Sequence, residues 1–371
     1  NNIIDPFVGS GTVLVESAFH SVNAYGIESH PYVNKIAKAK LQWMKSNTID
    51  LIKECKLLLD RAIKKNVTRK EYPPLISKCY PIETLRKLEA LKLACLEIEN
   101  KEVQDFTWFI ITSILRSTSP VGTAQWQYIQ PNKTKSKVLD PFYAYLLKIK
   151  EIEEDINMTK SRITDGSTQE VILEDSRNIQ LIPKDWGDLV ITSPPYANNY
   201  DYADAMRLEM CFWDDIEGWK DLQNKVRVNL IRACTQHVGN QKNEIKRILD
   251  SDILSCISTE LHEKYKELEL EREHHGGKKN YHLMIAAYFY DMAQVFHSLN
   301  RVTNEKCKMC FVIGDSAPYG IYIPVDKWLG ELAMSAGFKE YHFEKLRDRN
   351  IKWKNRKHRV PLKEGRLWIN K

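Results

Sequence analysis

The sequence lacks long apolar runs. None of its stretches approaches the roughly 18 consecutive apolar residues that a membrane-spanning helix needs, and no signal peptide opens the chain. We therefore expect a soluble protein of the cytoplasm, of a prokaryotic intracellular type, with no membrane partner. Its 371 residues are enough for one large domain with insertions, or for two domains.

A strong charge of one sign is also missing. The 55 Lys and Arg residues outnumber the 49 Asp and Glu residues only slightly, and the formal net charge is +6. Such a mild basic excess permits binding to nucleic acid but does not demonstrate it.

Pairs of metal ligands are scarce. Among the eight cysteines only Cys307 and Cys310 have the spacing of a metal site, and they lie in a run that is typical of a strand. Side chains three positions apart on a strand face opposite ways. With no second pair, we expect reduced, mostly buried thiols and no metal. The neighbouring His274 and His275 are expected in a loop rather than at a metal.

The stretch Thr192-Ser193-Pro194-Pro195-Tyr196 carries the strongest chemical signal. It follows the apolar run 187–191, which predicts a buried parallel strand that ends at this stretch. In an open α/β sheet, ligands bind beyond the carboxyl ends of the strands. Two prolines fix two φ angles and remove two backbone donors, so the loop is predicted to be a rigid set of hydrogen-bond acceptors.

Such a loop suits a flat ring with an exocyclic amino group. Ser193 Oγ and the Pro194 carbonyl are placed to accept one amino hydrogen each, while the Tyr196 ring stacks on the face of the ring. Both acceptors would stabilise positive charge that develops on the nitrogen as it attacks an electrophile. The alternative is a Ser-Pro-Pro turn that only ends a strand.

The N-terminal residues predict a second ligand-binding turn. An apolar strand leads into Asp5-Pro6-Phe7-Val8-Gly9-Ser10-Gly11, and a helix begins near Thr12. Glycines allow a ligand to approach the backbone closely, and a helix N-terminus favours a carboxylate or a phosphate. The next strand ends at Glu28, about 17 residues after Gly11, where nucleotide-binding sheets hold ribose hydroxyls. A solvated strand-end carboxylate is the alternative for Glu28.

Together, Asp5-Pro6-Phe7-Val8-Gly9-Ser10-Gly11-Thr12 and Ser193-Pro194-Pro195-Tyr196 resemble the paired motifs of the S-adenosylmethionine-dependent amino-methyltransferases of DNA. The resemblance implies an α/β, Rossmann-like methyltransferase sheet of about seven strands with a terminal antiparallel hairpin and helical insertions. It implies S-adenosylmethionine as the cofactor, held by Asp5, Pro6, Phe7, Gly9, Gly11 and Thr12, with Glu28 on the ribose and Asp175 on the adenine amine. A capping role before a turn is the alternative for Asp175.

The resemblance also implies the reaction and the partners. Ser193, Pro194, Pro195 and Tyr196 would hold a base flipped out of double-stranded DNA, because a stacked base cannot present its amino group. A first residue Ser usually accompanies methylation of cytosine N4, and Asp that of adenine N6. A cognate restriction endonuclease is a further candidate partner. The family usually has a segment upstream of the first strand that closes over the cofactor, so we expect residues upstream or another segment to do so here.

Polar and basic stretches outside these motifs are candidates for contact with DNA. Two stretches fit this role. One is formed by the residues that follow Ser193-Pro194-Pro195-Tyr196, a loop that we call the base loop. The other is the segment from Lys345 to Arg359, which carries eight cations and one acid. The candidates are Asn198, Asn199, Tyr200, Arg347, Arg349, Lys352, Trp353, Lys354, Arg356 and Lys357. Arg227 and Arg232 are weaker candidates.

The chain is expected to interleave one catalytic domain with two insertions. The expected parts are 1–45 (cofactor side), 46–164 (helical, a candidate for target recognition), 165–214 (base side), 215–282 (polar, a candidate for DNA contact) and 283–371 (last strands and basic hairpin). Three rival functions remain: an RNA or protein-glutamine N-methyltransferase, an inactive DNA-binding relative, and a dinucleotide-binding oxidoreductase, for which the Ser-Pro-Pro-Tyr loop has no evident use.

Overall fold

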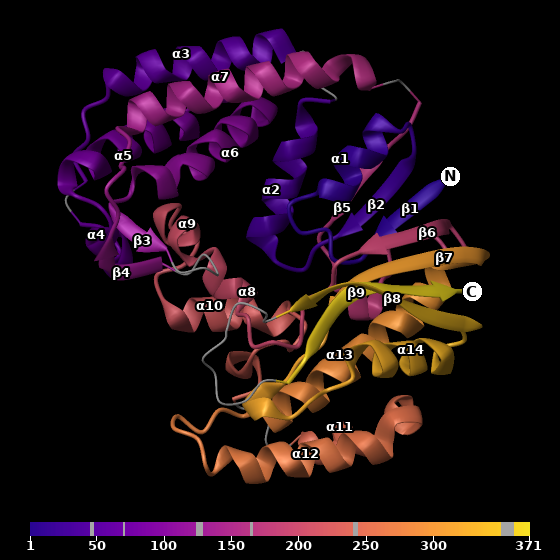
Figure 1. Ribbon diagram of the computed structural model, residues 1–371. Helices are drawn as coiled ribbons and strands as arrows, with labels where there is room; N and C mark the ends of the chain where they lie inside the picture. The colour runs from indigo at the N-terminus through magenta and orange to yellow at the C-terminus, as the bar shows by residue number, and fades with distance from the viewer. Residues whose placement is uncertain (45–47, 70, 124–128, 164–165, 240–243, 350–359) are drawn as a thin grey trace.

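The computed structural model describes residues 1–44, 48–69, 71–123, 129–163, 166–239, 244–349 and 360–371. Its centre is a seven-stranded sheet with the order β5-β2-β1-β6-β7-β9-β8 (Figure 1). The strands are β1 (Asn2–Asp5), β2 (Asn23–Ile27), β5 (Gln169–Ile172), β6 (Gly187–Thr192), β7 (Thr303–Gly314), β8 (Glu340–Arg349) and β9 (Leu362–Asn370).

Strand directions confirm the predicted fold class. The strands β5, β2, β1, β6 and β7 are parallel, whereas β9 pairs antiparallel with both β7 and β8. The five parallel strands therefore present their carboxyl ends at one edge of the sheet. In the terminal hairpin, pairing between β8 and β9 extends to Arg349 and Leu362.

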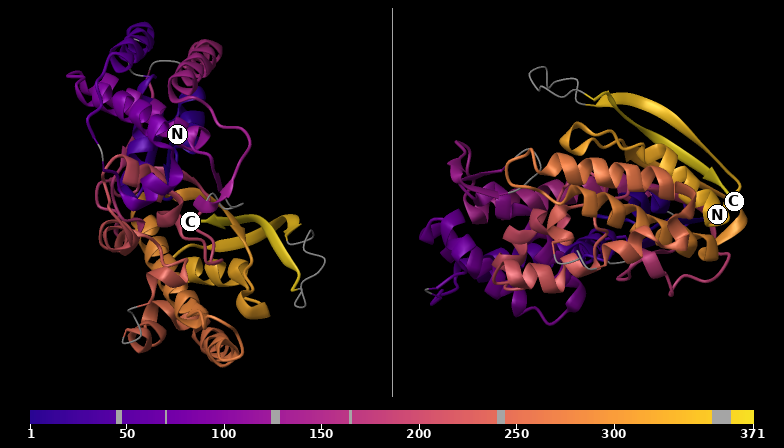
Figure 2. Two further views of the ribbon diagram at one scale, coloured as in Figure 1. Left: turned by 90° about the vertical axis from the view of Figure 1, so that its left-hand side faces the viewer. Right: turned by 90° about the horizontal axis from the view of Figure 1, so that it is seen from below.

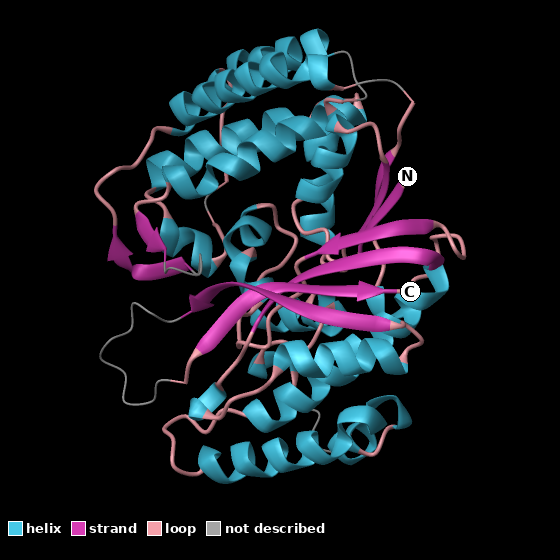
Figure 3. Cartoon of the chain, turned by 45° about the vertical axis from the view of Figure 1, so that its right-hand side comes forward, coloured by secondary structure: helices cyan, strands magenta, loops and turns pink. Residues whose placement is uncertain are grey.

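Helices cover both faces of the sheet (Figure 3). On one face, α1 (Thr12–Phe19) and α2 (Pro31–Gln42) pack over β2 and β5 around a small core that includes Leu14, Ala37 and Val171. Gly26 of β2 makes this packing close, because a Cβ there would lie 2.5 Å from Val8 Cγ2.

The other face carries the main hydrophobic core. It is covered by α13 (Tyr281–Val302) and α14 (Val325–Ser335), with α11 (Ile245–Leu249) and α12 (Ser258–Arg272) outside them. Helix α13 begins at Tyr281. Residues 283–289 are all buried, so the start of this helix has no exposed polar face. Its sequence therefore lacks the helical alternation of polar and apolar residues.

A second hydrophobic core lies in a helical unit. The views in Figure 2 show the helices of this unit beside the sheet. Its helices are α3 (Thr48–Ile63), α4 (Pro74–Cys79), α5 (Ile82–Leu96), α6 (Lys101–Thr118) and α7 (Pro141–Thr159). The stretch 118–137 contains the paired strands β3 (Val121–Thr123) and β4 (Ile129–Thr134).

The same core receives a later piece of the chain. Buried residues between Ala203 and Leu230, from α8 (Tyr202–Ala205), α9 (Arg207–Phe212) and α10 (Trp219–Lys225), belong to the core of the helical unit. From Ile231 onward, buried residues join the main core. Packing thus divides the segment 215–282 near residue 230, whereas the five expected parts remain predictions.

The cysteines agree with the expectation from their spacing. All eight are free thiols, and all except Cys256 are buried. Within the described ranges, no helix is both long and apolar enough to cross a bilayer.

Candidate active site

The two motif-bearing loops leave the sheet side by side. Strands β1 and β6 are parallel neighbours, with Ile3 opposite Leu189 and Ile4 opposite Val190. The glycine-containing loop after β1 and the Ser-Pro-Pro-Tyr loop after β6 therefore start at the same edge, although more than 180 residues separate them in the sequence.

A buried hydrogen bond joins these loops at their roots. Thr192 Oγ1 donates to Asp5 Oδ1 over 2.6 Å, and the Phe7 amide donates to the same oxygen over 3.0 Å. Burial raises the pKa of Asp5 to about 6, although both hydrogen bonds act in the opposite direction. Asp5 is only 3% exposed, and its two hydrogen bonds join the start of one loop to the start of the other.

The glycine-containing turn has the conformation that its sequence predicts. Gly9 and Gly11 have φ values of 51° and 88°, in the left-handed region that glycine adopts most readily. The Gly11 amide donates to the Val8 carbonyl over 2.9 Å, and α1 then begins at Thr12 without a side-chain cap. The first turn of α1 can therefore offer backbone N–H groups to an acidic ligand.

Pro6 and Phe7 complete this loop. The Pro6 carbonyl accepts a hydrogen bond from Ser176 Oγ, and half-buried Phe7 packs against the main core. The predicted cofactor residues between Asp5 and Thr12 thus form one continuous loop at the edge of the sheet.

Glu28 lies beside this turn at the end of β2. Its Oε2 accepts from the Gly9 amide over 3.1 Å, and its Oε1 accepts from the His30 amide over 2.8 Å. Burial raises the pKa of Glu28 to about 7, and the backbone hydrogen bonds partly oppose this shift. The carboxylate is thus positioned by the turn that it adjoins, as a ligand-holding group would be.

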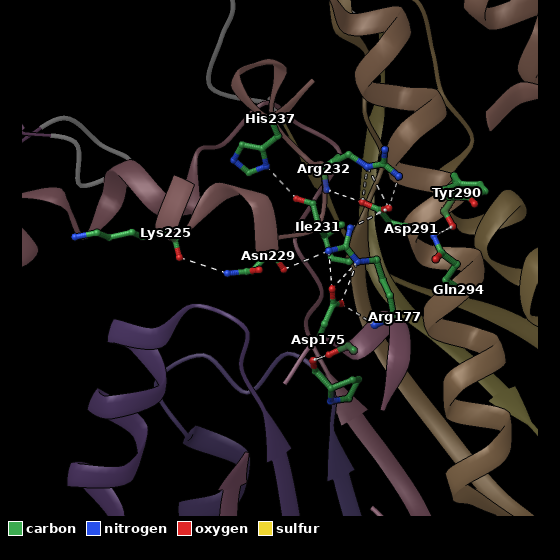
Figure 4. A network of polar contacts seen from close by, with 12 residues as sticks. Asp175, Arg177, Lys225, Asn229, Ile231, Arg232, His237, Tyr290, Asp291 and Gln294 are labelled. Atoms are coloured by element: carbon green, nitrogen blue, oxygen red, sulfur yellow. Dashed lines mark hydrogen bonds and ion pairs between the residues drawn. The ribbon is translucent and has the colours of Figure 1, made fainter. Parts of the chain in front are cut away.

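Asp175 is the most strongly engaged of the predicted cofactor residues. Its carboxylate caps the short 3₁₀ turn Ser176–Asn178 through the Arg177 amide over 2.9 Å, and it also accepts from Arg177 Nε over 2.9 Å. This geometry matches the capping role that the sequence left open. Arg177 also forms an ion pair with buried Asp291, and Arg232 forms a second ion pair with the same carboxylate (Figure 4).

The base loop presents its predicted groups at the edge. Ser193 is exposed, Pro194 is buried, and Pro195 and Tyr196 are half-buried. Burial raises the pKa of Tyr196, and the charge of the Glu364 carboxylate adds to this shift. The Ser193 hydroxyl donates to the Val312 carbonyl over 3.5 Å.

The residues after Tyr196 are braced from within the protein. Asn199, with a φ of 66°, accepts at Oδ1 from the Thr235 amide over 2.8 Å and from Thr235 Oγ1 over 2.7 Å. Asn198 Oδ1 accepts from the Tyr200 amide over 3.3 Å, and the Tyr200 and Tyr202 rings meet edge to face at 4.5 Å. The expected DNA contacts of Asn198, Asn199 and Tyr200 remain predictions, and these bonds give the side chains a local role.

Two arginines that were candidates for DNA contact instead form ion pairs inside the protein. Arg227 pairs with Asp201, and Arg232 pairs with Asp291. Both arginines are buried. Their carboxylate partners are distant in the sequence, so the local sequence does not predict this burial. Burial would raise the pKa of Asp201, but hydrogen bonds from His237 and Arg227 lower it to about 2.

Asp201, Cys234 and His237 are a buried group whose ligand atoms lie within 4.8 Å of one another. The Arg227 guanidinium already neutralises the Asp201 carboxylate, which disfavours a cation there. Of the neighbouring His274 and His275, His275 contacts Glu271 over 3.0 Å and stacks on the Tyr319 ring at 4.1 Å.

The sequence did not reveal the segment 229–237 as part of the site. Its Thr235 and Ala233 backbone hold Asn199, His237 contacts Asp201, and Arg232 joins the polar network of Figure 4. No local pattern marks this role, since every partner is distant in the chain.

The basic hairpin is described only in part. Arg347 has a side chain that is 70% exposed, whereas that of Arg349 is 18% exposed. The other predicted contacts of the hairpin lie outside the described residues: Lys352, Trp353, Lys354, Arg356 and Lys357.

Known proteins with similar sequences are named Type II methyltransferases. The chain is 29% identical to the Type II methyltransferase M.AvaI of Nostoc sp., over 91% of this chain and 73% of the relative. It is 23% identical to M.BsoBI of Geobacillus stearothermophilus, over 94% and 75%, and 22% identical to M.MvaI of Kocuria varians, over 93% and 75%, both also named Type II methyltransferases. No protein-family model matches the sequence. With the Rossmann-like fold, these relatives support a DNA methyltransferase.

Proposed function

We propose that the protein transfers a methyl group from S-adenosylmethionine to the exocyclic amino nitrogen of a base in double-stranded DNA. The favoured target is cytosine N4, because Ser193 opens the base loop. The observation that carries the proposal is the 2.6 Å hydrogen bond between Thr192 and Asp5, which holds a glycine-containing ligand turn beside a loop of acceptors.

The residues around the turn fit S-adenosylmethionine. The uncapped first turn of α1, from Thr12, would hold the carboxylate of its methionine part, and Gly9 leaves open space, since the nearest atom to an added Cβ is 4.0 Å away. Glu28 would accept the ribose hydroxyls. Asp175, whose side chain is 37% exposed, would accept from the adenine amine. S-adenosylmethionine supplies an electrophilic methyl group.

The base loop would orient the nucleophile. Ser193 Oγ and the Pro194 carbonyl would each accept a hydrogen of the amino group, and Tyr196 would stack on the base. These contacts direct the nitrogen lone pair towards the methyl group and stabilise the positive charge that grows on nitrogen. Loss of a proton after transfer restores the neutral amine, so the loop needs no strong base.

The target base must leave the DNA duplex before this reaction can occur. A stacked base cannot reach the edge of the sheet, so we infer that it is flipped out of the duplex. Exposed Arg347 on the basic hairpin is a candidate phosphate contact. A restriction endonuclease that cuts the same sequence is a further candidate partner.

Mass spectrometry of nucleosides tests the proposal. Unmethylated DNA is incubated with the protein and S-adenosylmethionine that carries a deuterated methyl group, and the DNA is then digested. We expect labelled N4-methylcytosine; labelled N6-methyladenine would retain the enzyme class but change the base. Parallel incubations with RNA and with protein test the rival substrates. Label in RNA or protein but not in DNA would refute the proposal.

A further inference from the structure

The hairpin of β8 and β9 reaches beyond the rest of the sheet. The last residue of β7, Gly314, pairs with Glu364, while β9 begins two residues earlier at Leu362, opposite Arg349. The end of the hairpin therefore overhangs the carboxyl edge of β7, next to the base loop that follows β6 (Figures 1 and 3).

Arg349 turns from this overhang towards the base loop. Its guanidinium carbon lies 5.3 Å from the centre of the Tyr196 ring, within the range of a cation–π contact. Its Nη1 donates to the Asp315 carbonyl over 3.0 Å, and its Nε lies 3.7 Å from Glu364 Oε2. Three neighbours thus hold the guanidinium in one place, and the side chain is mostly buried.

Gly314 provides the space for this arrangement. A Cβ at Gly314 would lie 2.5 Å from Arg349 Nη1, so the guanidinium crosses the strand where a side chain is missing. The φ of Gly314 is not in the left-handed region, so alanine fits the backbone there. The missing side chain of Gly314, at the end of β7, therefore makes room for the guanidinium of Arg349 at the end of β8.

Arg347, two positions earlier, has a different environment. It donates through Nε to Glu364 Oε1 over 2.8 Å, but its side chain is 70% exposed, against 18% for Arg349. A phosphate contact needs an accessible cation. Arg347 meets this condition and Arg349 does not.

We propose that Arg349 is a positioning residue for Tyr196 and not a phosphate contact. By holding the guanidinium against the tyrosine, the hairpin fixes the plane of the ring on which the flipped base stacks. This inference rests on the proposed function, since it assigns Tyr196 to the base. The consequence is that Arg349 governs the attack geometry more than the affinity for DNA.

The first test compares Arg349→Met with Arg347→Met, since methionine keeps a long side chain but removes the charge. For Arg349→Met we expect kcat to fall about 3- to 30-fold, the range of a cation–π contact, with a smaller change in the KM for DNA. For Arg347→Met we expect a higher KM for DNA and a slope of log affinity against log salt that is smaller by about 0.9.

The second test keeps the charge of Arg349. Gly314→Ala should displace the guanidinium from Tyr196 and lower kcat, while the salt dependence of DNA binding stays that of the native protein. If the alanine acts through Arg349, it should have little further effect in the double variant Gly314→Ala/Arg349→Met. The single variant Gly314→Ala also replaces the first test if Arg349→Met does not fold.

Two results would overturn the inference. One is a loss of salt dependence in Arg349→Met with native kcat, which would identify a phosphate contact. The other is native kcat in Gly314→Ala. Failure of the proposed function is a separate outcome, since the native protein itself would then transfer no methyl group to DNA.

Discussion

Replacing Thr192 with valine should uncouple the two loops in a pH-dependent way. Valine has nearly the same shape as threonine but has no hydroxyl, so Asp5 would lose the 2.6 Å donor and keep only the Phe7 amide. A hydrogen bond to a charged partner contributes about 1.5–3 kcal/mol, and one between neutral groups about 0.5–1.5 kcal/mol. The loss of stability therefore depends on the protonation of Asp5.

The direction follows from the raised pKa of Asp5, which burial brings to about 6. The Thr192 hydroxyl lowers this pKa, so Thr192→Val raises it further, and the folded variant binds a proton up to a higher pH than the folded native protein. The free-energy difference between the two proteins then grows as the pH rises through about 6. We expect a loss of about 2 kcal/mol near pH 8 and about 1 kcal/mol near pH 5.

Urea unfolding of both proteins at the two pH values measures the difference. Thr303→Val is a matched control, because Thr303 is fully buried and its Oγ1 donates over 2.8 Å to the Leu299 carbonyl, which does not titrate. The control should lose the same free energy at both pH values. A loss in Thr192→Val that does not change with pH would refute the reasoning.

Three further predictions follow from the site. Tyr196→Ala should reduce methyl transfer about 5- to 150-fold, the contribution of one stacked base, with the affinity for S-adenosylmethionine retained in calorimetry; Tyr196→Phe should stay active. Native affinity for S-adenosylmethionine should rise with pH through about 7 as Glu28 ionises, and Glu28→Gln should flatten this profile; an unchanged profile would contradict the ribose role. Asp291→Asn should destabilise the fold by about 3–5 kcal/mol in urea, since it leaves Arg232 and Arg177 with a weaker partner; no loss would show that the network is dispensable.

The sequence was most informative where chemistry is local. The strand before Gly9, the turn, and the helix from Thr12 follow from an apolar run, two glycines and helical spacing, and the structure has all three. The apolar run before Ser193 likewise predicted β6. The adjacency of β1 and β6 came from the structure, because no local pattern states which strands are neighbours.

Long-range polar contacts were beyond the sequence. Arg232 meets Asp291, 59 residues away, and Arg227 meets Asp201, 26 residues away. In a polar segment such arginines look like surface residues, and only the fold reveals that they are buried. The same limit applies to Arg349, whose distance from Tyr196 depends on the pairing of three strands and on a missing side chain at Gly314.

The division of the helical unit between two pieces of chain limits how it can change. Residues 48–159 form most of its core, but α8 to α10 return to it directly after the base loop. Removing the first piece would expose Leu208, Phe212 and Leu222 to water, and a single proteolytic cut would not release the unit. Exchange of this unit between related proteins would therefore have to replace both pieces together, with the Ser-Pro-Pro-Tyr loop retained between them.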